Sequence, residues 1–147
     1  IREHNFTDEP EPSTMQVRRI FWTPDGWPLV SAQPYAGEKE QPVSAKDVAG
    51  RYERINLVPS LPQGIQTSVP MKMREDGYYE CCSIQGTWEY ANNQVIIKYG
   101  PHTDKAYIMT VWDREKNQPT VALCGMTEKG VPFWAKRVGE SKWIRHK

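Results

Sequence analysis

The sequence lacks several features that would place it in familiar functional classes. Its 147 residues contain only three cysteines and three histidines. No apolar run approaches the roughly 20 residues that cross a bilayer. Lys and Arg number 19 and Asp and Glu 18, so the formal net charge is only +1. This near balance excludes the strongly basic surface that nucleic acids and anionic membranes select, and we expect neither as a partner.

Motifs that carry chemistry are also missing. There is no dinucleotide-binding glycine pattern, phosphate-binding loop, heptad repeat or nucleophile elbow. The histidines at 4, 102 and 146 are far apart, and the adjacent Cys81 and Cys82 do not have zinc-ligand spacing. Most carboxylates fall in turns or at strand ends, where solvation explains them. We therefore expect no catalytic residue, metal site or cofactor in this chain.

The odd number of cysteines prevents complete pairing within one chain. Cys81 and Cys82 would point to opposite faces of a strand, so either one could reach Cys124 across neighbouring strands. The alternative is that all three are free thiols, of which Cys124 lies in the apolar segment TVALCGM. We favour free thiols, because small buried cysteines pack well without bonding.

Aromatic and turn-forming residues are abundant: six Trp, seven Tyr, twelve Pro and ten Gly. Short β-branched and aromatic segments separated by turn residues indicate an all-β fold. Ser44 predicts one short helical turn over 44–49. Closure of the strands that follow into an eight-stranded antiparallel barrel would remove the exposed sheet edges. The expected strands are 50–58, 66–73, 78–84, 86–91, 93–99, 105–113, 118–126 and 131–138.

A hairpin precedes the expected barrel. Two apolar segments, 17–23 and 27–31, flank Pro24-Asp25-Gly26, which has strong turn chemistry. Four regions follow from this pattern. They are a linker or remnant of an upstream domain at 1–14, a hairpin and linker at 15–43, a barrel at 44–140 and a basic tail at 141–147. The start at Ile1, without an initiating Met, predicts a mature or truncated fragment.

Two groups of segments carry a family resemblance. The stretch MQVRRIFWTPDGWPLVSAQPYAGE, from Met15 to Glu38, resembles the end of the catalytic domain of glycoside hydrolase family 43 endo-arabinanases. AGRYERI, GTWEY, VIIKY and GVPFWAKRV resemble landmarks of the lipocalin-like barrel that follows that domain. The resemblance covers roughly residues 15 to 138.

The resemblance implies a division of labour within a larger enzyme. The parent would be an endo-1,5-α-L-arabinanase of a bacterium, extracellular or periplasmic. Its catalytic acids and a calcium ion would lie in the five-bladed propeller upstream of Met15, on the same polypeptide or a companion chain. This chain would be a non-catalytic accessory domain that stabilises the propeller and borders its substrate groove.

Exposed aromatic residues are the remaining candidates for a binding site. We expect Trp22, Trp27, Tyr35 and Trp143 to contact carbohydrate or a domain interface, because indole faces stack on sugar rings. The competing interpretation is that Trp22, Trp88, Trp112 and Trp134 fill the barrel or its interface.

Two further functions stay open at this point. One is an arabinan-binding module that uses exposed Trp and Tyr. The other is a small-ligand carrier with a cavity inside the barrel. Interior positions such as Met71, Met73, Ile97 and Phe133 would fill a barrel of this size and oppose the carrier.

Overall fold

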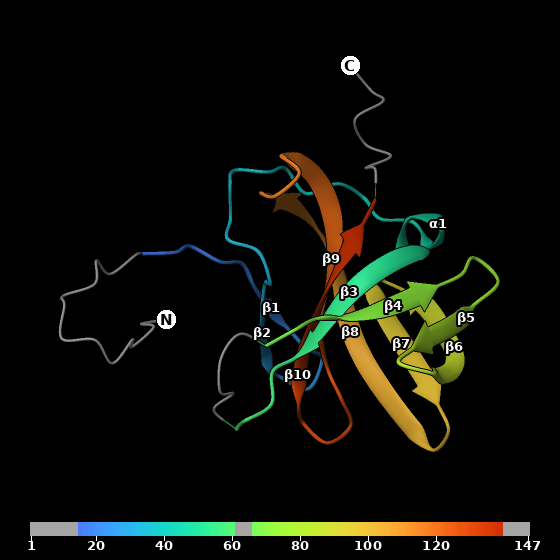
Figure 1. Cartoon of the computed structure of the whole chain (residues 1–147). Coiled ribbons are helices and arrows are strands. Elements are labelled where there is room, and N and C mark those ends of the chain that lie inside the picture. The colour runs from blue at the N-terminus through green and yellow to red at the C-terminus, as the bar shows by residue number, and fades with distance from the viewer. Residues whose placement is uncertain (1–14, 61–65, 140–147) are drawn as a thin grey trace.

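A computed structural model describes residues 15–60 and 66–139. It contains a two-stranded sheet, one short helix and a closed antiparallel barrel of eight strands (Figure 1). The hairpin consists of β1 (Ile20–Trp22) and β2 (Pro28–Val30), and the helix is α1 (Ala45–Val48). The barrel strands are β3 (Gly50–Asn56), β4 (Val69–Met73), β5 (Tyr78–Cys81), β6 (Ile84–Ala91), β7 (Gln94–Tyr99), β8 (His102–Asp113), β9 (Gln118–Met126) and β10 (Pro132–Val138).

The barrel is a meander in which each strand pairs with the next, and β10 closes it against β3. This confirms the eight-stranded antiparallel barrel and the preceding hairpin. The helix begins after Ser44, whose backbone N–H donates to the Asp47 carboxylate at 2.9 Å. In residues 15–60 and 66–139, no helix is long and apolar enough to cross a membrane.

Several predicted strand boundaries differ from the observed ones by one to three residues, and in one case the difference conceals a turn. The expected strand 78–84 ends at Cys81, and the next begins at Ile84. The intervening Cys82 and Ser83 have φ of 51° and 67°, which makes a two-residue turn of the left-handed type that hairpins prefer. Such turns usually carry Asn or Gly, as at Asn92 and Asn93, so the Cys-Ser pair gave no turn signal.

Large side chains fill the interior of the barrel. Alternation along each strand directs every second residue inward, and these residues form a single core cluster. Met71, Met73, Ile97 and Phe133 are each at most 2% exposed, which confirms their predicted interior positions. The absence of a side chain at Gly125 leaves room for the Phe133 ring, because a Cβ on residue 125 would lie 2.4 Å from that ring.

A charged pair is buried among these apolar groups. An Arg54 guanidinium nitrogen lies 2.8 Å from the Asp104 carboxylate, and the two side chains are 5% and 0% exposed. Arg54 also donates to the Tyr79 hydroxyl at 3.1 Å, and the Tyr99 hydroxyl donates to Asp104 at 3.0 Å. The guanidinium carbon lies 3.9 Å from the centre of the Phe133 ring. Hydrogen bonds and a ring face thus replace the lost hydration of both charges.

The hairpin packs on the outside of the barrel, over β8, β9 and β10 (Figure 1). Leu29 is 5% exposed and packs in a second apolar cluster with Met109, Val111, Ala122 and Cys124. The Trp134 indole and the Cys124 thiol both donate to the Val30 carbonyl, at 2.9 Å and 3.2 Å. The hairpin remains a separate sheet and shares no strand pairing with the barrel.

The three cysteines are free thiols in different surroundings. Cys81 belongs to the inner core cluster and Cys124 to the outer one, so the barrel wall separates them. Cys82 is exposed in the turn. The alternative pairing of Cys81 or Cys82 with Cys124 is therefore not formed.

Neutralising Asp104 should destabilise the fold strongly. Asp104→Asn preserves the volume but leaves the Arg54 cation buried without its counter-charge, at a cost of about 3–5 kcal/mol. Urea denaturation followed by tryptophan fluorescence measures this loss. The matched control is Glu89→Gln, which removes an exposed pair with Lys98 and should cost at most about 1 kcal/mol. Equal losses in the two variants would contradict a dominant role for the buried pair.

Thiol reactivity should follow burial. Burial raises the pKa of Cys124 to about 12. Burial, followed by the neighbouring Cys82 thiol, raises the pKa of Cys81. Because only the thiolate attacks a disulfide reagent, both should be slow at pH 8. Titration of the native chain with Ellman's reagent should therefore give one fast thiol, rising to three in denaturant. Cys82→Ser should abolish the fast phase, and its persistence in that variant would show that the assignment is wrong.

Candidate functional site

Exposed apolar side chains concentrate in the segment that precedes the barrel. Of the nine large apolar residues that are exposed in the described ranges, seven lie between Met15 and Tyr35. The barrel itself contributes only Ile84, and the segment after β3 contributes Val58. Those seven are Met15, Val17, Ile20, Trp22, Trp27, Val30 and Tyr35.

The register of the hairpin explains why one of its two faces is exposed to solvent. Phe21 pairs with Leu29, and both side chains pack toward the barrel. Ile20 pairs with Val30 and Trp22 with Pro28, so their side chains point to the opposite face. We call Val17, Ile20, Trp22, Trp27 and Val30 the hairpin surface; all five are at least 40% exposed.

The backbone beneath the hairpin surface is held in place. In the turn, Thr23 N–H donates to the Trp27 carbonyl at 2.9 Å, and Trp27 N–H donates to the Thr23 hydroxyl at 2.8 Å. At the other end, Arg18 donates to the Ser31 carbonyl at 3.0 Å and lies 5.5 Å from the centre of the Trp134 ring. The exposed side chains are therefore attached to a backbone that the hairpin's own hydrogen bonds hold in place.

The predicted site residues have separate positions. Trp22 and Trp27, 66% and 59% exposed, lie at the strand end and in the turn of the hairpin surface. Tyr35 lies near the opposite end, where its N–H donates to the Val17 carbonyl at 2.8 Å and Arg19 lies 5.1 Å from its ring centre. Trp143 lies outside the described residues. The structure thus brings two of the four predicted site residues, Trp22 and Trp27, together at one end of the hairpin.

A groove of about 790 Å³ forms a second candidate site. One wall is the linker that follows the hairpin, together with Asp47 of α1, and the other is the end of β8 and β9. The lining residues are Ala36, Gly37, Glu38, Lys39, Gln41, Pro42, Asp47, Thr110, Trp112 and Pro119. Sequence reasoning missed the groove, because its walls lie some seventy positions apart in the chain and Trp112 looked like a core residue.

The groove exists because β8 is longer than its neighbour β7. Strand β7 pairs with His102–Tyr107, so residues 108–113 of β8 pair only with β9. We call residues 108–113 of β8 and 118–121 of β9 the overhang. The inner face of the overhang presents Thr110 and Trp112 to the linker, and Gln41 N–H donates to the Thr110 hydroxyl at 3.2 Å.

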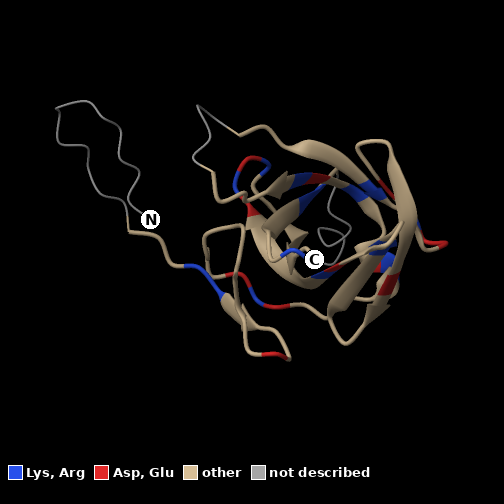
Figure 2. Ribbon diagram, turned by 90° about the horizontal axis from the view of Figure 1, so that it is seen from below, with Lys and Arg blue, Asp and Glu red and all other residues tan. Residues whose placement is uncertain are grey.

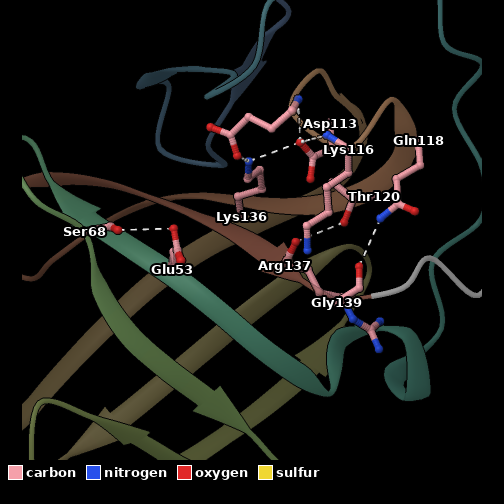
Figure 3. Close-up of polar contacts among 10 residues, drawn as sticks. Glu53, Ser68, Asp113, Lys116, Gln118, Thr120, Lys136, Arg137 and Gly139 are labelled. Atoms are coloured by element: carbon pink, nitrogen blue, oxygen red, sulfur yellow. Dashed lines mark hydrogen bonds and ion pairs between the residues drawn. The ribbon is translucent and has the colours of Figure 1, made fainter.

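Polar contacts anchor the overhang to β10 (Figure 3). The Lys136 ammonium lies 3.2 Å from Asp113 and 2.7 Å from Glu115. Gln118 donates to the Gly139 carbonyl at 3.0 Å, and Thr120 donates to the Arg137 carbonyl at 3.3 Å. These contacts fix the groove wall that carries Trp112.

The charges of the described residues suggest no separate ionic site. Basic and acidic residues are interspersed around the barrel rather than gathered by sign (Figure 2). Within residues 15–60 and 66–139, no group of three or more His, Cys, Asp or Glu side chains could hold a metal ion. Glu128 contacts His102 at the surface, and this contact lowers the pKa of the Glu128 carboxyl.

Known proteins resemble this chain in sequence. An extracellular endo-α-(1→5)-L-arabinanase of Thermotoga petrophila is 24% identical over 139 residues, which are 92% of this chain and 29% of that enzyme. Extracellular endo-α-(1→5)-L-arabinanase 2 of Bacillus subtilis is 24% identical over 135 residues, 90% of this chain and 28% of the enzyme. The chain spans less than a third of each relative.

Solved structures share the fold. A family 43 glycoside hydrolase of Bacillus licheniformis matches 85% of this chain with a TM-score of 0.75 at 23% identity. The T. petrophila endo-1,5-α-L-arabinanase matches 83% with a TM-score of 0.74 at 22% identity. Each match covers 28% of the larger chain.

A family model described as the C-terminal lipocalin-like domain matches residues 32–135. This match covers well over half of the chain, which therefore belongs to the C-terminal lipocalin-like domain family of glycoside hydrolase family 43.

Proposed function

We propose that this chain is a non-catalytic accessory domain of an extracellular arabinan-degrading enzyme, and that the hairpin surface docks on the propeller catalytic domain that precedes it. The observation that carries the proposal is the hairpin itself. One face packs on the barrel, whereas the other exposes Ile20, Trp22 and Val30. Such a contiguous apolar surface on an ordered hairpin is typical of an interface.

The comparisons support a partner on the same polypeptide. The relatives named as extracellular arabinanases are more than three times as long as the segment that this chain matches. The hairpin surface lies in the segment nearest to the N-terminus, where the chain would connect to an upstream domain. Burial of an exposed aromatic side chain contributes about 1.5–3 kcal/mol, so docking through Trp22 and Trp27 would stabilise both partners.

The buried carboxylates support a structural rather than a catalytic role. Asp104 is 0% exposed and paired with Arg54, and Asp113 is 1% exposed and paired with Lys136. A general acid must be in contact with the substrate. Neither carboxylate meets that requirement, because each is held by a cation and closed off from a ligand.

A carbohydrate-binding module is the second candidate. The exposed indoles of Trp22 and Trp27 would suit sugar stacking, and this observation favours it. A small-ligand carrier has no such support, because side chains such as Tyr52, Met71 and Phe133 fill the barrel interior.

Substitution of the hairpin tryptophans should affect the Tm of the intact enzyme but not that of the isolated domain. Trp22→Ala or Trp27→Ala should lower the Tm of the full-length enzyme by several degrees, because each removes a side chain that docking buries. The same changes should barely alter the Tm of this chain alone, where both indoles are exposed. Ile84→Ala, on β6, is the matched exposed control. If both tryptophan variants left the Tm of the enzyme unchanged, the hairpin surface would not be the docking site.

The isolated 147-residue chain should release no reducing sugar from debranched arabinan, whereas the full-length enzyme should do so. The reason is that a glycoside hydrolase needs two carboxylates across the scissile bond, and we assign none here. A reducing-sugar assay over a long incubation measures this. Activity of the isolated chain that disappears on mutation of one of its own acids would overturn the non-catalytic assignment.

A further inference from the structure

We propose that the groove beside the overhang is a subsite for an uncharged oligosaccharide, with Trp112 as the stacking platform. The choice of an arabino-oligosaccharide as ligand rests on the proposed function. The groove volume of about 790 Å³ lies within the range of roughly 300–1,000 Å³ that is typical of small-molecule sites. It is made by the linker, Asp47 of α1 and the overhang, and none of its lining residues belongs to the hairpin surface.

Trp112 differs from the other tryptophans of the barrel strands. The indole N–H groups of Trp88 and Trp134 donate to the Arg74 and Val30 carbonyls, at 2.8 Å and 2.9 Å. Trp112 is only half-buried, and its N–H has no hydrogen-bond partner among residues 15–60 and 66–139. It therefore offers a ligand both an aromatic face and a hydrogen-bond donor. A sugar ring, with an apolar face and hydroxyl edges, needs both.

The rest of the lining suits an uncharged polyhydroxylated ligand. Pro42 and Pro119 provide apolar surface. Glu38 and Asp47 bring negative charge to the groove, and Lys39 brings positive charge. In the described residues the Lys39 ammonium has no ion-pair partner. A hydroxyl both donates and accepts, so it can satisfy the carboxylate and the ammonium alike. An anionic or cationic ligand would meet a like charge on one side of the same groove.

The groove is also ordered in advance. On the linker wall, Arg19 donates to the Glu38 carbonyl at 2.8 Å, and Ala36 N–H donates to the Glu38 carboxylate at 2.8 Å. On the opposite wall, the Lys136 contacts hold the overhang. Binding would therefore immobilise few side chains, which lowers its entropic cost.

Isothermal titration of the 147-residue chain with α-1,5-linked arabinohexaose tests the proposal. We expect saturable binding that Trp112→Ala weakens by about tenfold or more, since loss of a stacked aromatic removes more than about 1.4 kcal/mol. Trp112→Phe should retain most of the affinity because it keeps a ring face. Ile84→Ala, which alters an exposed side chain of β6 outside both the groove and the hairpin surface, should bind like the unaltered chain. Thermal melts establish that each variant is folded.

If Trp112→Ala proves unfolded, Lys39→Ala replaces it, and the same titration should show severalfold weaker binding. No binding by the unaltered chain overturns the subsite. So does binding that survives both groove variants, or that is lost in Trp22→Ala or Trp27→Ala, which would place the sugar on the hairpin surface. Docking is measured independently, by the Tm of the full-length enzyme. Trp112→Ala should not change the part of the full-length enzyme's Tm that docking contributes. Failure of the subsite would therefore appear in the titration, whereas failure of the proposed function would appear in the Tm of the hairpin variants.

Discussion

Closure of the barrel from strands of unequal length is the constraint on which the other features depend. Strand β8 has 12 residues and β9 has 9, whereas β7 has 6 and β5 has 4. The excess length leaves the overhang projecting beyond the closed ring as a two-stranded ribbon. Such a ribbon is marginal in water and needs support on both faces. The hairpin covers its outer face, through Met109 and Val111, and the linker lies along its inner face, at Thr110.

The hairpin in turn depends on that support. Its strands have three residues each and could not persist alone. Burial of Leu29 and the two hydrogen bonds to the Val30 carbonyl fix it on the barrel wall. Because side chains alternate along a strand, fixing one face determines the direction of the other. Packing on the barrel therefore fixes the position and orientation of the exposed Ile20 and Trp22 side chains.

Local patterns in the sequence were sufficient for the fold and insufficient for the sites. Turn residues such as Asn92-Asn93 and the alternation of apolar residues predicted the barrel, the hairpin and the helical turn. The Arg54–Asp104 pair was not visible, because its partners lie fifty positions apart and each resembles an ordinary strand charge. The barrel tryptophans show the same limit. Trp88 is in the core, Trp134 lies under the hairpin and Trp112 lines the groove, although all three occupy similar strand contexts.

The two surfaces differ in chemistry although they share one support. The hairpin surface consists of apolar side chains only, which suits a protein partner that excludes water from the whole patch. The groove combines one indole with opposite charges and free hydrogen-bonding groups, which suits a ligand that is itself part apolar and part hydroxyl. Both rest on the overhang, on its outer and inner faces. Lys136, which is 14% exposed and ties the overhang to β10 through Asp113, would therefore support both the proposed docking and the proposed sugar binding. If both proposals hold, the domain would keep a substrate chain at a fixed position relative to a catalytic domain docked on the hairpin surface.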